Sequence, residues 1–494
     1  RDTARVVVKG YLTTPGVDFA ESSSPVATDT SIRKMIGILL FSEKGKLWIR
    51  EMFDVEAAFR NADLDSPMYV EWPEGMVELG FMTQEEVERY CIQLDRAMYG
   101  NVDAPIRWMR TFSKHLKSIG MIQSKTDPCI FYKLDEKGEL ELMMAVHVDD
   151  TVITGTRKSV DWCYQKIQEK FKIDLLGIIK KHLGVWWTWN RDENGLHLVA
   201  SMEKMEEAII QDYEKTTGET VKKWNTPGTP GKVLCKSEGA PVKIEAYRSI
   251  VGKALYYMTK VAPELANAVR ELSSHMANPN DDHWKELGRL VGYLKHRPPA
   301  GLTFRRPTEL RSISLSDSNY GTDPDTRRSI SGRVSTLGGM ITGWSSRKQA
   351  TVTLSSTEAE YIALTDCTQE MRMMNMLLQE LFRKPQRGTI YEDNTGAIFL
   401  VRNQQVGSRT KHIDIRYHYL RDLNESGEME VKFVRTDDNI SDLMTKNLPE
   451  KLYDKHVSSI KDGSTLTRLR EDVKRPESAR RSDGQDSVKS PSVT

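Results

Sequence analysis

The sequence predicts a multidomain α+β protein, and three observations carry this prediction. The chain has 494 residues, which exceeds the size of a single hydrophobic core and indicates two to four domains. Short apolar runs typical of strands are mixed with helical patterns in the first 200 residues and again after about residue 306. A mainly helical stretch separates these two parts.

The elements follow in order along the chain. Residues 1–200 hold strand-like runs at 4–8, 142–148 and 151–155, with a helical pattern at 108–120. Residues 201–305 are mainly helical, as at 247–276, and are interrupted by a turn rich in Pro and Gly at 225–231. These patterns predict a first α+β domain and a helical connecting domain.

Strand-like runs return at 312–321, 331–344 and 389–394, with a long helix expected to start near Ser356. This pattern predicts a second α/β domain over residues 306–462. Residues 463–494 are polar, with few large apolar side chains, and we expect them to form a disordered tail.

Composition excludes several classes of protein. No run of eighteen apolar residues offers a membrane span, and the five cysteines contain no C-x-x-C pair that would indicate a zinc site. The net charge of +1 neither requires nor excludes nucleic acid, since local clustering of charge decides phosphate binding. The first residues have neither an initiating Met nor a signal-peptide pattern, which indicates a fragment of a longer chain.

A first set of carboxylates lies near the ends of strand-like runs. Asp54 ends one short apolar stretch, and Asp149 and Asp150 lie between two others. Nucleotidyl transfer requires divalent metals to neutralise phosphates, and Mg²⁺ prefers carboxylate oxygens. An isolated Asp–Asp pair is more often a hairpin turn, so the surrounding sequence has to decide.

The surrounding blocks resemble those of copia-type LTR retrotransposon reverse transcriptases, in the same order. The blocks are TARVVVKG, SPVATDTSIR, DVEAAFRNADL, YVEWPEG, MYGNVDAP, DPCIFY and HVDD. The resemblance covers nearly the whole chain. It implies reverse transcriptase fingers and palm in residues 1–200, a helical thumb or connection in 201–305, and then a ribonuclease H-like domain with a mixed sheet.

By this resemblance, Asp54 and Asp149 are expected to bind metal, with Asp150 as the adjacent carboxylate. Phe59 matches an aromatic that would collide with a ribose 2′ hydroxyl, although a core aromatic is the simpler interpretation of the residue alone. Arg5 resembles a cation that meets the incoming triphosphate, whereas an Arg near an apolar strand is usually solvated.

The chain departs from the family pattern in three ways. His147 replaces the Tyr before V-D-D, and Asp103 replaces a Gln that would help line the nucleotide pocket. An acid there should repel triphosphate oxygens unless a metal or an Arg intervenes. The third departure is that the family's fingers begin upstream of residue 1.

A second set of acids lies in the last predicted domain. Asp317 ends a strand-like run, and Asp393 and Asp442 lie in TIYEDN and NISDLMTKNL. Ser355 and Glu358 have capping-box spacing, which leaves Glu360 as the expected ligand on the long helix. Each acid alone is more often a turn or cap residue.

Here too the blocks resemble the family, in its ribonuclease H domain. These are SDSNYG, R-S-x-SG, WSSRKQ-x-T-V-x-LSSTEAEYIAL, DNTGAI, RTKHIDIRYH and D-L-M-TK-x-L. The resemblance implies an acidic tetrad of Asp317, Glu360, Asp393 and Asp442. Arg347 and Lys348 belong to an acid-poor basic stretch expected to follow phosphates, with an exposed basic hairpin as the alternative. Lys411 and His412 are further candidates for substrate contact.

The resulting hypothesis is an RNA-directed DNA polymerase joined to a ribonuclease H, each with two Mg²⁺ or Mn²⁺ ions. Its expected partners are an RNA template, a DNA primer, RNA·DNA hybrids, dNTPs and other Pol or Gag products, without a membrane. The resemblance implies cytoplasmic virus-like particles with possible nuclear entry. The alternatives are a decayed element that keeps only ribonuclease H and a non-catalytic nucleic-acid-binding relic.

Overall fold

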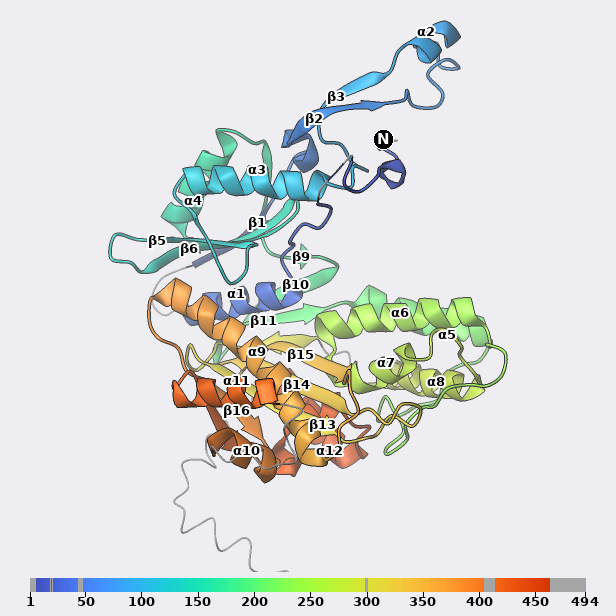
Figure 1. Cartoon of the computed structure of the whole chain (residues 1–494), viewed down its shortest axis with the longest axis vertical. Coiled ribbons are helices and arrows are strands. Elements are labelled where there is room, and N and C mark those ends of the chain that lie inside the picture. The colour runs from blue at the N-terminus through green and yellow to red at the C-terminus, as the bar shows by residue number, and fades with distance from the viewer. Residues whose placement is uncertain are drawn as a thin grey trace, which may run out of the picture. The chain divides into compact units, whose positions relative to one another are not determined.

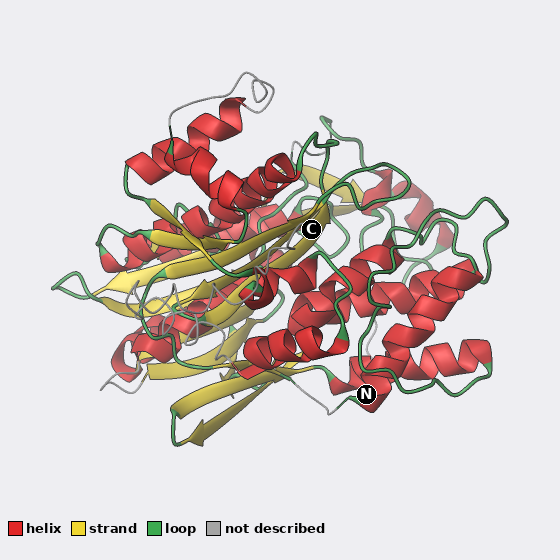
Figure 2. Cartoon of the chain, turned by 90° about the horizontal axis from the view of Figure 1, so that it is seen from below, coloured by secondary structure: helices red, strands yellow, loops and turns green. Residues whose placement is uncertain are grey.

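The computed structural model describes residues 6–17, 19, 21–42, 48–297, 301–403 and 414–462. The chain groups into two compact units. The first is Arg1–Ile179 with Leu377–Lys384, and the second is Lys180–Met376 with Pro385–Thr494. The element labels are given in Figure 1, and helices and strands are distinguished by colour in Figure 2. The domain boundaries expected from the sequence stay predictions.

The first unit contains a six-stranded antiparallel sheet in the order β4-β5-β6-β7-β1-β8. Its strands are β1 (Trp48–Val55), β4 (Ile122–Gln123), β5 (Ile130–Leu134), β6 (Leu140–His147), β7 (Asp150–Thr156) and β8 (Ile173–Ile178). Strands β6 and β7 are buried along most of their length, as expected for central strands. This sheet holds the first set of acids.

A two-residue turn, Val148 and Asp149, joins β6 to β7. Val148 has a φ of 60°, which is unusual for a β-branched residue. Trp108 Nε1 donates a hydrogen bond of 2.7 Å to the Val148 carbonyl oxygen. The turn is therefore anchored from a helix that is distant in sequence.

Three long helices belong to this unit: α1 (Asp29–Ser42), α3 (Ala104–Ser118) and α4 (Arg157–Gln168). Helix α3 begins with Pro105 in its first turn and buries Trp108 and Phe112, whose rings are stacked 5.0 Å apart. A two-stranded ribbon of β2 (Asp63–Val70) and β3 (Ile92–Arg96) carries the short helix α2 (Gln84–Arg89).

The second unit begins with a four-stranded sheet in the order β12-β11-β10-β9. Its strands are β9 (Lys181–His182), β10 (Val185–Asp192), β11 (Gly195–Ser201) and β12 (Leu302–Phe304). Between β11 and β12 lie α5 (Glu203–Thr217), α6 (Ile244–Val261), α7 (Ala266–Ser273) and α8 (Asp281–His296). The helical character expected after residue 201 is present.

A five-stranded mixed sheet follows, in the order β15-β14-β13-β16-β17. Its strands are β13 (Ser312–Asn319), β14 (Ile330–Leu337), β15 (Met340–Lys348), β16 (Gly388–Glu392) and β17 (Met429–Phe433). Strands β13, β14 and β15 pair antiparallel, whereas β16 pairs parallel with both β13 and β17. The prediction of an α+β protein with a mixed sheet is confirmed.

The helices of this part are α9 (Ser356–Phe382), α10 (Thr395–Arg402), α11 (Asp414–Glu425) and α12 (Glu450–Asp462). Helix α9 starts at Ser356 as predicted. Tyr361 and Leu364 of α9 are buried with Ile390 of β16 and Val431 of β17 in one hydrophobic cluster. This packing fixes the first turns of α9 against the strands that carry acids.

The start of α9 agrees with the capping interpretation of Glu358. The Glu358 amide donates to Ser355 Oγ at 3.1 Å, and Glu358 Oε2 accepts from the Leu354 amide at 2.7 Å. The side chain of Glu358 is thus used to satisfy backbone donors at the helix start.

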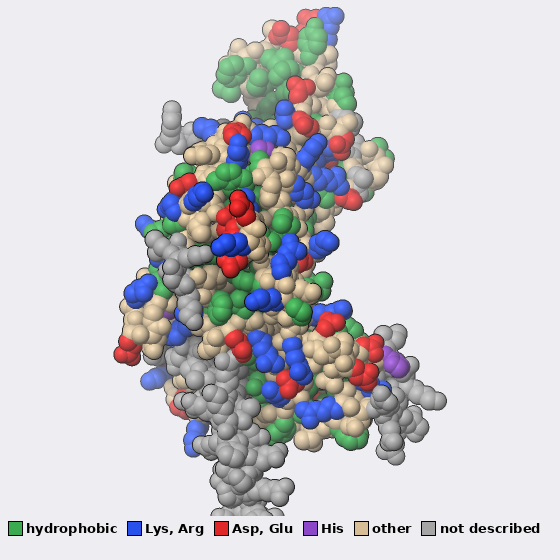
Figure 3. Space-filling model, turned by 90° about the vertical axis from the view of Figure 1, so that its left-hand side faces the viewer, with side chains coloured by type: hydrophobic (Ala, Val, Ile, Leu, Met, Phe, Trp, Pro, Cys, Tyr) green, Lys and Arg blue, Asp and Glu red, His purple; other side chains and the backbone are tan. Residues whose placement is uncertain are grey.

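Charge is distributed in both signs over the surface. On the face seen in Figure 3, Lys and Arg side chains are interspersed with Asp and Glu. None of the helices that the structure describes is both long enough and apolar enough to cross a membrane.

Candidate active sites

The first set of acids lies across three neighbouring strands of the first unit. Asp54 on β1 is directly opposite Asp150 on β7, and on its other side it is opposite Asp174 on β8. Asp149 lies in the turn before β7, and its carbonyl oxygen accepts from the Val55 amide at 3.2 Å. Strand alternation and register therefore bring Asp54 and Asp150 onto one face of the sheet.

The electrostatics of this row are unfavourable without a cation. Burial raises the pKa of Asp54, and the charges of Asp149, Asp150 and Asp174 raise it further. Burial and Asp149 also raise the pKa of Asp150, against an opposing effect of His147. Facing carboxylates of this kind attract a hard divalent cation.

The first unit does not gather its acids as closely as the second. Within the described ranges, the sets of three or more metal-ligating side chains with atoms within 4.8 Å of one another all lie in the second unit. The register of Asp54 and Asp150 is compatible with a metal site, but a closed ligand set is absent from the described part of the first unit.

Each residue predicted at or near the nucleotide pocket that the structure describes contacts a named neighbour. Phe59 is half-buried, and its ring lies 5.0 Å from that of Tyr99 in an edge contact. Asp103 is the N-cap residue of α3 and is ion-paired with Arg107, with 2.5 Å between Oδ2 and Nε. His147 Nδ1 is 2.9 Å from the Ala27 carbonyl oxygen.

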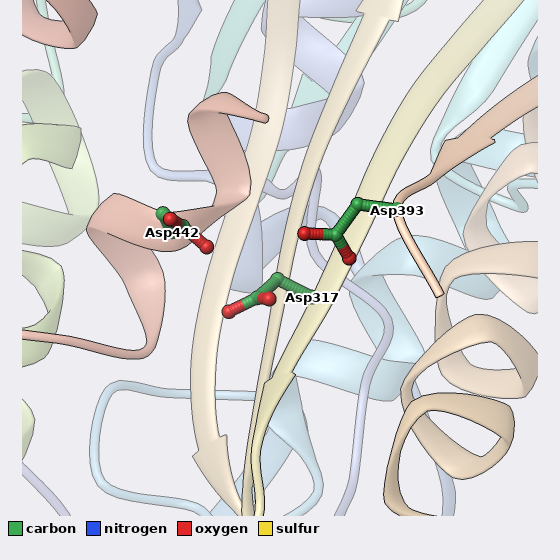
Figure 4. A group of neighbouring side chains, drawn as sticks. All are labelled: Asp317, Asp393 and Asp442. Atoms are coloured by element: carbon green, nitrogen blue, oxygen red, sulfur yellow. The ribbon is translucent and has the colours of Figure 1, made fainter. Parts of the chain in front are cut away.

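The second set of acids converges from three separate elements. Asp317 lies near the end of β13, Asp393 directly follows β16, and Asp442 lies in a 3₁₀ helix, Ile440–Met444. Each offers one carboxylate oxygen, and these three atoms lie within 4.8 Å of one another. Figure 4 shows the three carboxylates directed toward a common point.

A lysine lies beside this group. Lys446 Nζ is 2.9 Å from Asp442 Oδ1 and 3.4 Å from Asp317 Oδ1, and Thr445 Oγ1 donates to Asp317 Oδ2. Burial lowers the pKa of Lys446, but the attraction of Asp317 and Asp442 outweighs it and raises the pKa above its ordinary value. Lys446 is thus a fixed positive charge within the acidic centre.

Glu360 approaches the same centre from α9. It forms a second close set with Glu392 and Asp393, again within 4.8 Å, so that Asp393 belongs to both sets. Burial, followed by repulsion from Glu392, Asp317 and Asp393, raises the pKa of Glu360 to about 11. Burial and the charge of Asp442 also raise the pKa of Asp317 well above its ordinary range.

The residues of this centre fit divalent metal ions. All donors are carboxylate oxygens, the ligands that Mg²⁺ and Mn²⁺ prefer. Glu360 Oε2 is buried and has no hydrogen-bond partner among the described residues. Several buried carboxylates cannot all ionise beside one lysine, and bound cations would supply the missing positive charge.

The predicted phosphate-binding residues of β15 differ in their exposure and ion pairing. Arg347 is exposed at the end of β15, whereas Lys348 forms an ion pair with Asp323. The candidates Arg5, Lys411 and His412 lie outside the described residues.

Three residues of these sites were missed from the sequence. Asp174 gave no signal, because register alone brings it opposite Asp54. Glu392 directly precedes Asp393, and the side chains of adjacent strand residues are expected on opposite faces of the sheet. The sequence alone therefore offers no reason to place Glu392 beside Asp393. Lys446 follows Asp442 by four residues, a helical spacing that could have indicated their pairing.

Comparison with known proteins covers both units. Residues 1–227 match the family model described as "Reverse transcriptase (RNA-dependent DNA polymerase)". The Pol polyprotein of transposon RE1 from Arabidopsis thaliana is 32% identical over 463 residues, covering 93% of this chain and 30% of that protein. The Pol polyprotein of transposon TNT 1-94 from Nicotiana tabacum is 30% identical over 463 residues, covering 92% of this chain and 34% of that protein.

The chain thus spans about a third of the length of these relatives. Among solved structures, LC11-RNase H1 isolated from compost is 14% identical and covers 30% of this chain and 99% of its own, with a TM-score of 0.23. That likeness is too weak to bear on function. From the family model and the relatives, the chain belongs to the Pol region of copia-type LTR retrotransposons, with its reverse transcriptase segment in residues 1–227.

Proposed function

We propose that the chain is an RNA-directed DNA polymerase joined to a ribonuclease H that degrades the RNA strand of RNA·DNA hybrids. The observation that carries the proposal is the convergence of Asp317, Asp393 and Asp442, with Glu360 beside them, in a unit separate from Asp54 and Asp150. One chain then offers two acidic centres suited to phosphoryl transfer.

When bound, divalent ions supply charge neutralisation at the phosphate and lower the pKa of an attacking water or 3′ hydroxyl. In the second unit, Asp317, Glu360, Asp393 and Asp442 would hold these ions. In the first, Asp54 and Asp149 would do so, with Asp150 beside them. The ions are Mg²⁺ or Mn²⁺, since every donor is a carboxylate.

The other residues of the second unit orient this centre. Thr445 fixes one oxygen of Asp317, and Lys446 holds the carboxylates of Asp317 and Asp442 toward each other. Exposed Arg347 is suited to a phosphate of the hybrid. Recognition through backbone, shape and 2′ hydroxyls would be largely independent of sequence.

In the first unit, the substrates would be a primed RNA template and dNTPs. Asp103 does not present an unpaired charge to a triphosphate, because Arg107 holds its carboxylate. Phe59 has an exposed part that could exclude a ribose 2′ hydroxyl. By family analogy, the chain would act with other Pol and Gag products in cytoplasmic particles.

A second candidate function is ribonuclease H activity alone, in a decayed element. The observation in its favour is that the close ligand sets of the described chain belong to the second unit. Asp103 and His147 also differ from the family pattern in the polymerase segment.

A paired assay of the purified chain with Mg²⁺ or Mn²⁺ tests both candidates. It measures dNTP extension on a primed RNA template and loss of RNA from an RNA·DNA hybrid. We expect Asp149→Asn to abolish extension and spare cleavage, and Asp393→Asn to abolish cleavage and spare extension. Cleavage without extension in the unmodified chain would favour the decayed element, and the absence of both activities would refute the proposal.

A further inference from the structure

Glu392 is a buried acid at the acidic centre of the second unit that the expected tetrad does not include. It is the last residue of β16 and is fully buried. Ser316 Oγ donates to its Oε2 at 2.5 Å, and the Asn394 amide donates to its Oε1 at 3.1 Å. Two hydrogen bonds therefore fix the orientation of this carboxylate.

The carboxylate of Glu392 lies within reach of a shared cation. Glu360, Glu392 and Asp393 each offer one oxygen, and these atoms lie within 4.8 Å of one another. The set adjoins the set of Asp317, Asp393 and Asp442 through Asp393, which is common to both. Two adjoining sets with one shared carboxylate are suited to a pair of neighbouring ions.

The second observation is a buried oxygen without a donor. Glu360 is 7% exposed, and its Oε2 has no hydrogen-bond partner among the described residues. Lys446 bonds to Asp317 and Asp442 of the other set. Within the described ranges, no basic side chain forms an ion pair with Glu360, Glu392 or Asp393. A carboxylate in such a place is ionised only when a cation lies beside it.

We infer that Glu392 is a metal ligand, the fifth carboxylate of this centre, and that with Glu360 and Asp393 it forms a subsite for a hard divalent cation. The inference rests on the proposed ribonuclease H function and adds a ligand to it. An all-carboxylate donor set selects Mg²⁺ or Mn²⁺ over softer metals. Ser316 acts as a positioning residue, because it orients Glu392 toward Glu360.

The test is a calorimetric titration of the full chain with Mn²⁺ in the absence of nucleic acid. Glu392→Gln keeps the shape of the side chain and an acceptor for the Asn394 amide, but it removes the charge. We expect one Mn²⁺ binding event at this centre to weaken about tenfold or to disappear. Glu358→Gln is the matched control, because Glu358 is also a buried glutamate, at 7% exposed, and its side chain caps the start of α9. Equal Mn²⁺ affinity in Glu392→Gln and the unmodified chain overturns the inference.

Thermal unfolding separates a ligand from a mere structural anchor. We expect Glu392→Gln to have a Tm in EDTA no lower than that of the unmodified chain, because repulsion between buried acids is reduced. Its Tm increase on adding Mn²⁺ should be smaller, because a ligand that binds the folded state stabilises it. A lower Tm in EDTA with the full Mn²⁺ increase would show that Glu392 only anchors β16, and the inference would be wrong.

A second variant keeps the test decisive if Glu392→Gln does not fold. Ser316→Ala removes one hydrogen bond to Glu392 and should weaken Mn²⁺ binding about threefold. Unchanged Mn²⁺ binding in Ser316→Ala would then overturn the inference.

These binding measurements do not depend on hybrid cleavage. If cleavage is absent but Mn²⁺ binding depends on Glu392, the proposed function fails and the subsite stands. If cleavage is present and Glu392→Gln binds Mn²⁺ as tightly as the unmodified chain does, only the inference fails.

Discussion

Arg107 lies one helical turn after Asp103 in α3, and its Nε is 2.5 Å from Asp103 Oδ2. Both side chains are largely buried, at 12% and 6% exposed. The sequence alone placed an acid where it should repel a triphosphate. The structure instead has an arginine that neutralises this acid, so the repulsion argument against polymerase activity loses its basis.

This ion pair predicts that substitutions of Arg107 and Asp103 are coupled in their effect on the free energy of unfolding. We expect Arg107→Met to lower the free energy of unfolding by about 3 kcal/mol, because it leaves the Asp103 carboxylate buried without a cation. The double variant Arg107→Met with Asp103→Asn should recover at least half of that loss. Chemical denaturation measures both. Additive effects of the two substitutions would show that the pair is not coupled.

The positions of the metal-site candidates followed from local patterns. Asp54 lies near the end of β1 and Asp150 begins β7, and the two residues are opposite each other in the sheet. The apolar run before Asp54 and the apolar run after Asp150 indicated these positions. Glu358 could be separated from Glu360 because a capping box has a fixed spacing. Patterns of this kind depend only on residues that are close in the sequence.

The residues that were missed depend on long-range packing. Glu392 contacts Ser316 across 76 positions of sequence, and a pairing of β16 with β13 has to be known before this contact can be expected. The pairing of Lys348 with Asp323 was likewise invisible, since the expected basic face was defined by the absence of acids between Thr326 and Thr357. Both contacts depend on which strands are neighbours in the sheet, and the composition of a segment does not indicate this.

The turn between β6 and β7 leads to a prediction for the polymerase. Asp149→Asn should lower dNTP extension by about three orders of magnitude, because a lost metal ligand costs several kcal/mol of transition-state stabilisation. Asp135→Asn is the matched control, since Asp135 lies in the neighbouring turn between β5 and β6 and its side chain accepts from the amides of Lys137 and Glu139. Extension rates on a primed RNA template measure the effect. Equal rates in both variants would exclude Asp149 from catalysis.

The lysine at the second acidic centre leads to a prediction about metal dependence. Lys446→Met should lower the free energy of unfolding in EDTA by about 2 kcal/mol, because the buried carboxylates of Asp317 and Asp442 lose their counter-ion. Saturating Mn²⁺ should remove most of the difference, since bound ions then neutralise the same acids. Lys455→Met serves as the control, because Lys455 pairs with Asp438, which is not one of the acids of this centre. A stability loss that is unchanged by Mn²⁺ would contradict this account.

Acid sensitivity of the second unit should depend on His456 of α12. This side chain is 1% exposed, and its Nε2 has no hydrogen-bond partner among the described residues. Burial, helped by the charge of Lys455, lowers the pKa of His456 to about 4, against the opposing effect of Asp438 and Asp437. The folded protein therefore keeps this imidazole neutral under conditions in which the unfolded chain protonates it.

The sign of the pH effect follows from proton uptake. Between the unfolded pKa near 6.5 and the folded pKa of about 4, the unfolded state binds more protons, so stability falls as the pH falls. Above pH 6.5, protonation of His456 takes nothing from the free energy of unfolding. At pH 5, it should lower the free energy of unfolding by about 2 kcal/mol. Denaturation at pH 7.5 and pH 5 should therefore show a smaller loss in His456→Gln than in the unmodified chain. His418→Gln, at an exposed position, should keep the full loss. If His456→Gln loses as much stability as the unmodified chain, the acid sensitivity arises from other groups, of which the buried His275, whose pKa burial also lowers to about 4, is the next to test.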